Sequence, residues 1–446
     1  MIAKNFADFA VGSRTKGLDA QTYAAAGRAA MDWFGATIAG SVMEPAQALR
    51  RAFVFTEGAG RSALVPSGVC VDPRTAAMIN GTASHTAELD DIFREGIYHP
   101  GSPTVAAALA AGQHLAVSGE RFLRAIAVGY EIGDRIAAAM QPAHYTYWHT
   151  TGTVGTIGAA AAVAEIMELD AEHFAHALAT ATTMAAGLQQ AFRSDAMSKP
   201  LHAGHAGDAG LFAAFAAAEG FTGALDILEG EAGFGAAMSD AVDWPGALAE
   251  LGAPWAVRQA TVKNHSCCGH TLAAVDAALE LRDGRLDVSA ISAIRIQTYS
   301  TATKVAGNAE PTTAFEAKFS LSYCVAAALL LGSVRLAAFT PERLADPAIR
   351  AVMSRTVVEA SDEFDVDFPA RRRARVTVEF ADGTSVTALR NTRKGDPDDP
   401  LTDTELRQKF DELASKVIGQ KRSDVLAKQL LALTELEDLS ALGSPS

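Results

Sequence analysis

A short charged stretch, ELDDIFREGIYHPG at residues 88–101, interrupts a chain that is otherwise rich in small apolar side chains. It holds four carboxylates, one arginine and one histidine within fourteen residues. Arginine can bind a carboxylate, and histidine can move a proton near neutral pH. The same stretch could also be a capping loop, in which Asp90 or Asp91 begins a helix. Other polar islands must therefore decide between the two interpretations.

Four further islands carry histidine, lysine or tyrosine in surroundings that are otherwise apolar. They are YTYWHTTGTVG with His149, RSDAMSKPLHAGHAGDAG with Lys199 and His202, TVKNHSCCGH with Lys263, and AKFSLSYCVA with Tyr323. Lysine and arginine would bind carboxylates, while histidine and tyrosine can transfer protons. Together they suit removal of a proton from carbon next to a carboxylate, where the developing enediolate needs positive charge and hydrogen-bond donors. Each residue alone could equally be a cap or a packed core residue.

Other chemistries lack their usual motifs. HSCCGH at residues 265–270 has neither a CxxC nor an HxxxH pair, so we expect no metal site there. GHAGDAG lacks the Lys-Ser/Thr ending of a phosphate loop and the spacing of a dinucleotide fingerprint. The chain contains no GxSxG nucleophile elbow. We therefore expect neither a metal nor an organic cofactor.

Composition restricts the partners. The 446-residue chain has 49% hydrophobic residues and a formal net charge of −14, which disfavours binding to nucleic acid or to anionic lipid. The N-terminus lacks the apolar core of a signal peptide, and no segment offers the run of about 20 apolar residues that a membrane span needs. Four cysteines, two of them adjacent, do not form a disulfide framework. The prediction is a cytoplasmic protein with reduced thiols.

The elements that must position these islands change character near residue 265. Before it, apolar residues at helical spacing predict helices. These helices lie near 20–40, 103–117, 121–140, 153–167, 170–190, 207–219 and 222–229, with RSDAMSKPLHAGHAGDAG as a Gly-rich loop.

After residue 265, helices are predicted to alternate with a strand in SAIRIQTYS and with a hairpin across Asp382 and Gly383. Thr402 and Glu405 form a capping box that begins a further helix, and the tail from Arg422 is predicted to pack on the first module. The fold class is thus mainly α with an α+β module.

Five ordered blocks resemble the MmgE/PrpD family, which includes 2-methylcitrate dehydratase, cis-aconitate decarboxylase and iminodisuccinate epimerase. The blocks are ELDD followed by HPG at 88–111, KPLHAGHAGDAGLFAAFAAAEGFTGALDILEGEAGF at 199–234, VKNHSCCGH at 262–270, AKFSLSYCVAAALL at 317–330 and KGDPDDPLTDTELRQKF at 394–409. The resemblance implies a large all-helical domain (residues 1–264 and 403–446), a smaller α+β lid domain (265–402) and an active site between them. It also implies a homodimer without an obligatory metal or cofactor.

The family's site positions can be carried over residue by residue. They fall on Asp91, His99, His149, Lys199, Lys263 and Tyr323. The resemblance suggests His99 and His149 as proton-transfer groups, Lys199 and Lys263 as carboxylate anchors, and Tyr323 as a hydroxyl donor from the lid. Asp91 is counted with the catalytic residues. Arg94 and His202 complete the expected substrate-binding set. We expect a small di- or tricarboxylate as the substrate.

Departures from the family pattern leave the reaction open. Ile92 and Phe93 stand where dehydratase and decarboxylase members have a threonine after the acidic pair, and Arg94 and Glu95 add charges. A dehydratase of the 2-methylcitrate type is placed first because it is the commonest assignment in the family. An epimerase of the iminodisuccinate type is close behind. A cis-aconitate-type decarboxylase and a non-catalytic polycarboxylate-binding protein are the third and fourth candidates.

Overall fold

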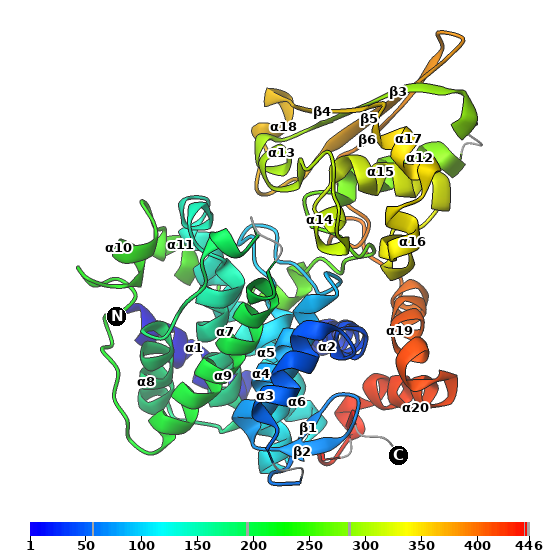
Figure 1. Ribbon diagram of the computed structural model, residues 1–446. Helices are drawn as coiled ribbons and strands as arrows, with labels where there is room; N and C mark the ends of the chain where they lie inside the picture. The colour runs from blue at the N-terminus through cyan, green and yellow to red at the C-terminus, as the bar shows by residue number, and fades with distance from the viewer. Residues whose placement is uncertain (56–57, 193–195, 284–286, 441, 444–446) are drawn as a thin grey trace. The chain divides into compact units, whose positions relative to one another are not determined.

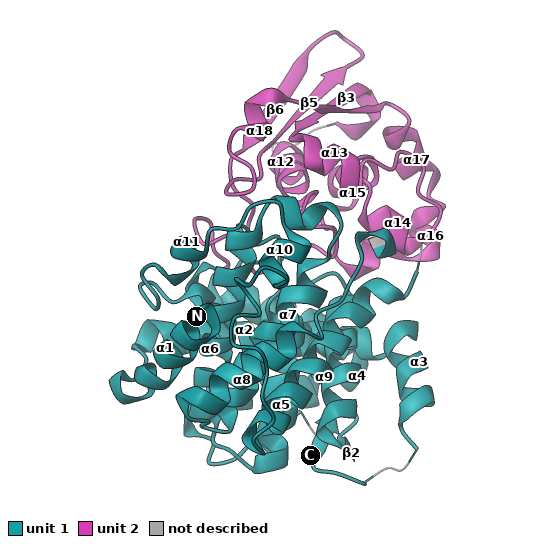
Figure 2. Ribbon diagram, turned by 90° about the vertical axis from the view of Figure 1, so that its left-hand side faces the viewer, with its two compact units in different colours: residues 1–261, 402–446 teal, residues 262–401 magenta. Residues whose placement is uncertain are grey.

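The computed structural model describes residues 1–446 except 56–57, 193–195, 284–286, 441 and 444–446. The chain forms two compact units, coloured separately in Figure 2. Unit 1 comprises Met1–Thr261 and Thr402–Ser446, and unit 2 comprises Val262–Leu401. The sequence placed these changes at 264/265 and 402/403.

Unit 1 is built almost entirely from helices (Figure 1). Its longer helices are α1 (Ile2–Lys16), α2 (Ala20–Ser41), α3 (Glu44–Phe53), α4 (Pro73–Thr86), α5 (Gly101–Leu115), α6 (Gly119–Met140), α7 (Thr150–Ile166), α8 (Ala171–Thr182), α9 (Ser198–Ala218), α19 (Asp403–Ile418) and α20 (Gln420–Leu431). Its shorter helices are α10 (Phe234–Met238), α11 (Trp244–Leu248), η1 (Ala143–Thr146), η2 (Gln189–Phe192), η3 (Ala256–Gln259) and η6 (Leu433–Glu435). The predicted capping box at Thr402 and Glu405 is confirmed at the start of α19.

The small residues of unit 1 let its helices approach closely. Gly204 and Gly210 of α9 have no room for a side chain, because an added Cβ would lie 2.2 Å from the Met78 carbonyl oxygen of α4 and 2.6 Å from the Ala160 nitrogen of α7, respectively. The prediction of a Gly-rich loop was therefore wrong for residues 198–206, which form the start of α9, whereas the helix predicted from residue 207 is confirmed as its continuation. Tight helix packing overrides the low helix propensity of glycine.

Other details of unit 1 also differ from the prediction. The helix predicted at 170–190 ends at Thr182 as α8. Residues 222–229 form irregular structure and turns rather than a helix, in a segment that glycines at 220, 223 and 230 interrupt. A two-stranded antiparallel ribbon, β1 (Ser62–Leu64) with β2 (Val69–Val71), also stands in the domain predicted to be all-helical. Side chains of Gln113 and Asn80 bind the backbone of β1 and of the residue that follows it, which fixes the ribbon against the helices.

Unit 2 is an α+β module. Its sheet has the order β4-β3-β5-β6, in which β3 pairs parallel with β4 and antiparallel with β5, and β5 pairs antiparallel with β6. The strands are β3 (Ile291–Thr298), β4 (Thr356–Ala360), β5 (Ala374–Phe380) and β6 (Ser385–Arg390). The strand in SAIRIQTYS and the hairpin at Asp382 and Gly383 are thus confirmed.

Helices of unit 2 pack on this sheet through a common apolar core. They are α12 (Leu272–Asp283), α13 (Ser300–Ala306), α14 (Ala314–Lys318), α15 (Leu321–Leu331), α16 (Pro341–Leu344), α17 (Pro347–Met353), α18 (Asp362–Asp365), η4 (Val288–Ala290) and η5 (Leu336–Phe339). The mainly α fold class with a small mixed sheet is confirmed. None of the described helices combines the length and the apolar composition that a membrane crossing needs.

Candidate active site

The charged stretch forms the connection between α4 and α5 of unit 1. His85 lies in the last turn of α4, and His99 stands two residues before the start of α5. The backbone of the connection enters the left-handed region at Glu88 (φ 58°) and Ile97 (φ 47°), which non-glycine residues adopt rarely. These two turns fold the stretch back on itself, and Phe93 pairs with Tyr98 in a short antiparallel bridge.

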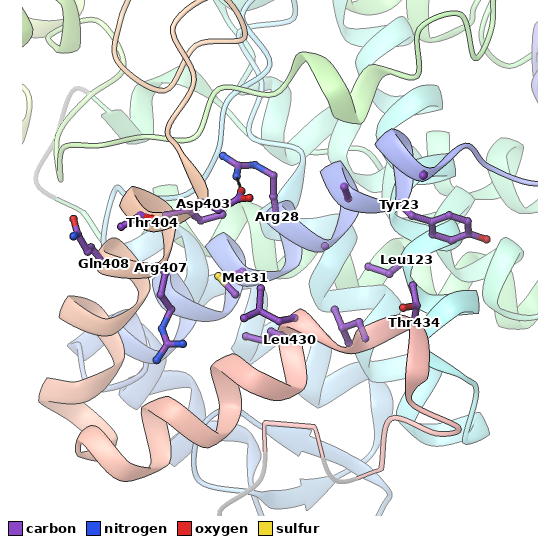
Figure 3. Close-up of a pocket in the computed structure, with 16 residues that line it drawn as sticks. Tyr23, Arg28, Met31, Leu123, Asp403, Thr404, Arg407, Gln408, Leu430 and Thr434 are labelled. Atoms are coloured by element: carbon purple, nitrogen blue, oxygen red, sulfur yellow. Dashed lines mark hydrogen bonds and ion pairs between the residues drawn. The ribbon is translucent and has the colours of Figure 1, made fainter.

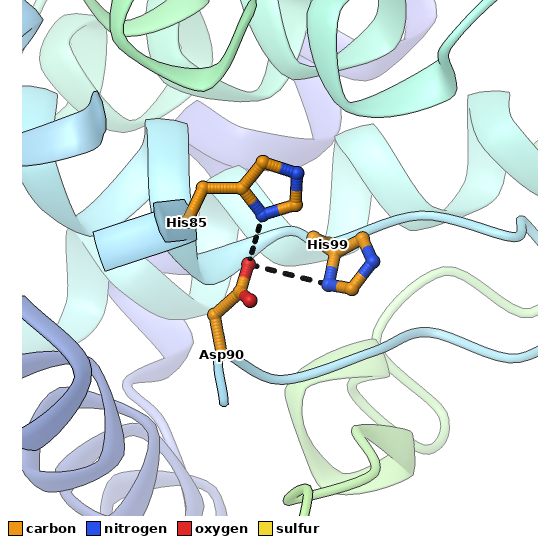
Figure 4. A group of neighbouring side chains, drawn as sticks. All are labelled: His85, Asp90 and His99. Atoms are coloured by element: carbon orange, nitrogen blue, oxygen red, sulfur yellow. Dashed lines mark hydrogen bonds and ion pairs between the residues drawn. The ribbon is translucent and has the colours of Figure 1, made fainter. Parts of the chain in front are cut away.

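Asp90 is the centre of a buried polar cluster (Figure 4). Its Oδ2 lies 2.6 Å from His85 Nδ1 and 3.2 Å from His99 Nδ1, and it accepts a hydrogen bond of 2.8 Å from Ser102 Oγ. Burial alone would raise the pKa of Asp90, but the two histidines, through charge and hydrogen bonding, hold this pKa well below its usual value. Asp90 is therefore ionised at neutral pH.

A second pair of histidines adjoins this cluster. His149 precedes α7, His202 lies on α9, and their Nδ1 atoms are 3.0 Å apart. The ring of His85 stacks on that of His149 with a centroid distance of 5.4 Å. The rings of His85 and His99 meet edge to face, with a centroid distance of 4.8 Å. Burial, followed by the charges of His85 and His202, holds the pKa of His149 well below its usual value. His149 is therefore neutral, and burial likewise lowers the pKa of His202 to about 4.

Asp91 faces different partners from its neighbour. Its Oδ2 accepts a 2.6 Å hydrogen bond from the hydroxyl of Tyr130 on α6, and its Oδ1 accepts one of 3.0 Å from the backbone nitrogen of Gly101. Burial, together with the charges of Asp32 and Asp90, raises the pKa of Asp91 to about 7. In the structure, Asp90 rather than Asp91 is the carboxylate that contacts His99.

The predicted anchors of unit 1 carry acidic partners. Lys199, at the start of α9, forms a buried ion pair with Glu88. Arg94 Nε lies 4.0 Å from Glu95 Oε1, in a pair that is more exposed on the glutamate side. Lys199 thus contacts the α4–α5 connection that also carries His99. The Arg94–Glu95 pair lies on that same connection.

Lys263 and Tyr323 belong to unit 2 and are both fully buried. The Tyr323 hydroxyl donates a 2.6 Å hydrogen bond to the carbonyl oxygen of Ala338, and burial raises the pKa of Tyr323 to about 12. Burial would also raise the pKa of the Cys267 thiol, but hydrogen bonding to Cys324 and nearby positive charge, including that of Lys263, lower this pKa instead. The hydroxyl of Tyr323 therefore has a backbone partner within its own unit, and Lys263 lies near a thiol.

The three residues of Figure 4 are also a possible donor set for a metal ion. One ligand atom from each of His85, Asp90 and His99 lies within 4.8 Å of the others. Two ligands of a tetrahedral zinc ion at about 2.1 Å would stand roughly 3.4 Å apart. The 2.6 Å between His85 Nδ1 and Asp90 Oδ2 is instead the length of a hydrogen bond. The donor types fit a metal, whereas this separation fits a shared proton.

A large pocket elsewhere in unit 1 has a different character (Figure 3). It has a volume of about 790 Å³ and lies among α2, α6, α19 and α20, with Met31, Leu123 and Leu430 on its apolar lining. Arg28 and Asp403 form an ion pair at one side. The lining residues that the structure describes include neither histidine nor lysine, so the pocket lacks the proton-transfer groups of the Asp90 cluster.

Sequence reasoning missed two members of the cluster, His85 and Asp90. His85 lies in ASHTA, among small and hydroxyl side chains that are typical of a helix surface, and Asp90 was considered only as a cap. A signal was present in the five-residue spacing between them, because a histidine in the last turn of a helix can reach a carboxylate in the following loop. That interpretation needs the turn at Glu88, which no propensity predicts.

A buried constellation of histidines and carboxylates, set between helices, defines a candidate enzyme site for proton transfer. Comparison with known families places the chain. Residues 4–246 match the MmgE/PrpD N-terminal domain, and residues 265–433 match the MmgE/PrpD C-terminal domain. The chain therefore belongs to the MmgE/PrpD family.

Several curated relatives align with most of the chain. A cis-aconitate decarboxylase-like protein, oryM, of Aspergillus oryzae is 29% identical over 399 residues, which cover 83% of this chain and 81% of the relative. Cis-aconitate decarboxylase of Aspergillus terreus is 26% identical over 411 residues, covering 86% and 84%. Cis-aconitate decarboxylase of Homo sapiens is 27% identical over 383 residues, covering 83% and 78%. The chain is thus similar to family enzymes along most of its length.

Proposed function

We propose that the protein is a metal-independent lyase that removes water from a small hydroxy-di- or tricarboxylate. The observation that carries this proposal is the contrast between two histidines of unit 1, the buried His149 and the partly exposed His99. His149 is neutral because burial lowers its pKa, whereas His99 lies 3.2 Å from the ionised Asp90. A neutral imidazole can accept a proton, and an imidazole beside a carboxylate is favoured as its protonated form.

Dehydration needs both of these groups. His149 takes the proton from the carbon next to a substrate carboxylate, and the electron pair of that C–H bond forms the new double bond. The C–O bond at the adjacent carbon breaks, and His99 delivers its proton to the departing hydroxyl, which leaves as water. Asp90 stabilises His99 while its ring is cationic. One proton is accepted and one is donated, so the net charge of the site is unchanged. Before the next turnover, His149 must lose its proton and His99 must regain one, directly or through solvent.

The remaining site residues are proposed to hold the substrate. Lys199 can offer its ammonium group to a carboxylate if it exchanges Glu88 for the substrate, and Lys263 is a second proposed anchor. Arg94 and His202 are proposed to contact the more distal end of the substrate. Tyr323 is proposed as a hydroxyl donor, which requires its hydrogen bond to Ala338 to be exchanged. Asp91 is proposed to act indirectly: it accepts a hydrogen bond from the backbone nitrogen of Gly101 and so fixes the start of α5.

Decarboxylation is the second candidate, and the relatives favour it. The relatives named above are cis-aconitate decarboxylases or resemble them. Loss of carbon dioxide leaves the same type of carbanion, which then needs a proton donor rather than a base. His99 beside Asp90 could supply that proton, whereas a neutral His149 would have no role in it. The two candidates therefore differ in their need for His149.

One experiment separates the reactions. The protein is incubated in deuterium oxide with a panel of di- and tricarboxylates, including hydroxy acids and cis-aconitate, and followed by proton NMR. We expect an alkene product and loss of activity in His149→Gln. Release of carbon dioxide with an active His149→Gln variant would support decarboxylation instead. Exchange of an α-proton with inversion and no alkene would support the epimerase. Binding without turnover of any compound would leave a non-catalytic polycarboxylate receptor.

The acid side of the pH profile supplies an independent check. If His149 is the base, its lowered pKa keeps it active below the ordinary histidine value of 6.5. The acidic limb of kcat/KM should therefore fall below pH 6.5. A limb above that value would contradict the assignment of His149 as the base.

A further inference from the structure

His85 touches every histidine and carboxylate on which the proposed proton transfer depends. Its Nδ1 lies 2.6 Å from Asp90 Oδ2, the atom that also faces His99 Nδ1 at 3.2 Å. Its ring stacks on that of His149, with an angle of 24° between the planes. The His85 side chain is fully buried, so it stands between the two proposed proton-transfer groups and not at the surface.

The contacts of Asp90 determine which ring nitrogens carry protons. A carboxylate oxygen only accepts hydrogen bonds, so the Nδ1 atom of His85, which is at hydrogen-bond distance from Oδ2, must bear hydrogen, and the Nδ1 atom of His99, which pairs with Oδ2 at 3.2 Å, is placed to do the same. For each ring, the Nε2 atom is then the one that can gain or lose a proton, and Figure 4 shows both Nε2 atoms on the far side from Asp90. His85 Nε2 has no hydrogen-bond partner among the described residues. The free atom of His85 is therefore not used to hold the fold.

We propose that His85 is a positioning residue for the acid–base chemistry of this site. It fixes the Asp90 carboxylate, which in turn keeps Nδ1–H of His99 turned towards Asp90 and leaves the Nε2–H of the protonated ring free to donate to the substrate. Its stacked ring also keeps His149 in place. This inference rests on the proposed function, because it assigns His85 a part in the same reaction, but the orientation of His99 can be measured without any substrate.

His144 shows what a purely structural buried histidine looks like in the same unit. Its Nδ1 lies 2.9 Å from the carbonyl oxygen of Met238, and its Nε2 lies 2.8 Å from Thr153 Oγ1. Both ring nitrogens are thus satisfied, whereas one ring nitrogen of His85 is buried without a partner. Burying an unpaired polar atom costs about 1–3 kcal/mol, so the unpaired Nε2 of His85 carries a cost that the two contacts of His144 avoid.

Two substitutions separate the positioning role from simple packing. In His85→Asn the amide nitrogen takes the place of Nδ1 and can still donate to Asp90. In His85→Gln the amide nitrogen takes the place of Nε2, and the donor to Asp90 is lost. His144→Gln is the matched control, because it replaces an equally buried histidine that lies outside the proposed machinery.

We expect His85→Gln to lower kcat by about 10- to 100-fold with little change in KM, as is typical when a partner that orients a functional histidine is removed. His85→Asn should recover most of that loss. His144→Gln should lower thermal stability and leave kcat within a few-fold. Equal losses of kcat in His85→Asn and His85→Gln, or a loss expressed only in KM, would overturn the proposal.

Nitrogen-15 NMR of protein with labelled histidine rings tests the tautomer directly. His99 is assigned by its disappearance in His99→Gln. At a pH high enough for its ring to be neutral, the wild-type protein should show its single proton on Nδ1. In His85→Gln its signal should move towards a mixture of tautomers. A wild-type His99 that carries its single proton on Nε2 would refute the positioning role, even if the His85 variants fail to fold. If no carboxylate is turned over while this NMR result holds, the proposed reaction fails and the positioning of His99 stands.

Discussion

Asp90 and Asp91 are consecutive in the sequence, yet they face opposite regions of unit 1. Asp90 faces the histidines of the α4–α5 connection, and these hold its pKa well below the usual value. Asp91 faces Tyr130 and the start of α5, where burial raises its pKa to about 7. Both side chains are almost completely buried. Burial alone therefore does not decide the charge of these carboxylates; the partners at hydrogen-bond distance do.

This difference separates two kinds of task. A group that stays ionised beside histidines can stabilise positive charge during proton transfer. A group that titrates near pH 7 beside a tyrosine and a helix start is suited to holding the backbone of the site. Volume is a poor guide by comparison, because the 790 Å³ pocket of Figure 3 has an apolar lining and lacks histidine among its described residues.

The largest expected effect is a loss of activity on replacing His99, the histidine that lies beside Asp90. His99→Gln should lower kcat/KM by about 10²- to 10⁴-fold, because it removes the proposed proton donor. The measurement is the initial rate with whichever carboxylate the panel identifies. Circular dichroism and thermal unfolding check that the variant is folded.

His144→Gln supplies the contrast on a histidine with structural partners only. It should retain kcat/KM within a few-fold while losing about 1–3 kcal/mol of unfolding free energy, because a buried partner is left unpaired. If His99→Gln and His144→Gln lost activity equally, the loss in His99→Gln could not be assigned to a missing proton donor.

Substitution of Asp91 should change how the stability of the protein depends on pH. Between its ordinary value of 3.8 and about 7, the folded protein keeps a proton on Asp91 that the unfolded chain has released. Stability is therefore lost as the pH rises through this interval, by a few kcal/mol in total. Asp91→Asn keeps a neutral side chain at every pH. Relative to wild type, the variant should gain about 2–3 kcal/mol between pH 5 and pH 8, as measured by urea unfolding.

Asp90→Asn should behave in the opposite sense. Because the folded-state pKa of Asp90 is lowered, ionised Asp90 contributes stability above the unfolded-state value, and this contribution disappears as the pH falls through the folded-state pKa. The deficit of Asp90→Asn relative to wild type should therefore be full at pH 7 and shrink in acid. Parallel pH dependence in the two variants would show that the neighbouring carboxylates do not differ as the structure indicates.

Local patterns in the sequence predicted much of this architecture. Apolar periodicity identified the helices of unit 1, Asp382 and Gly383 identified the hairpin of unit 2, and Thr402 identified the start of α19. Each of these signals is local, so a short window of sequence contains it. The glycines at 204, 207 and 210 of α9 misled the same reasoning, because the close backbone of neighbouring helices such as α4 and α7, which explains them, lies outside the window.

The candidate site was predictable in its residue types but not in its contacts. His99, His149 and Lys199 were identified as members, whereas the partner of His99 was missed. Which of two consecutive aspartates meets the histidines depends on the left-handed turns at Glu88 and Ile97. Such backbone conformations are set by tertiary contacts and carry no reliable residue signature.

Gly101 offers a smaller test of the Asp91 region. A Cβ at this position would lie 2.6 Å from Asp91 Oδ1 and 2.7 Å from the Tyr130 hydroxyl oxygen. Gly101→Ala should therefore displace both groups and cost about 1–3 kcal/mol of unfolding free energy. Gly12→Ala in α1 is the control, because no atom lies within 4 Å of the added Cβ. That variant should gain about 0.5–1 kcal/mol, so a gain in Gly101→Ala would show that the contacts around Asp91 are loose.

The smallest expected effect concerns metal. His85, Asp90 and His99 have donor types that a divalent transition metal accepts, but the 2.6 Å between His85 Nδ1 and Asp90 Oδ2 is a hydrogen-bond length. If the cluster works through shared protons, dialysis against a strong chelator should leave kcat/KM within twofold, and metal analysis of the active protein should find less than stoichiometric zinc, iron or manganese. Added zinc should then inhibit, because it would replace the proton between His85 and Asp90 and occupy His99. Loss of activity on chelation with recovery on adding one metal would reverse the assignment, and Asp90 would be a metal ligand instead of the carboxylate that orients His99.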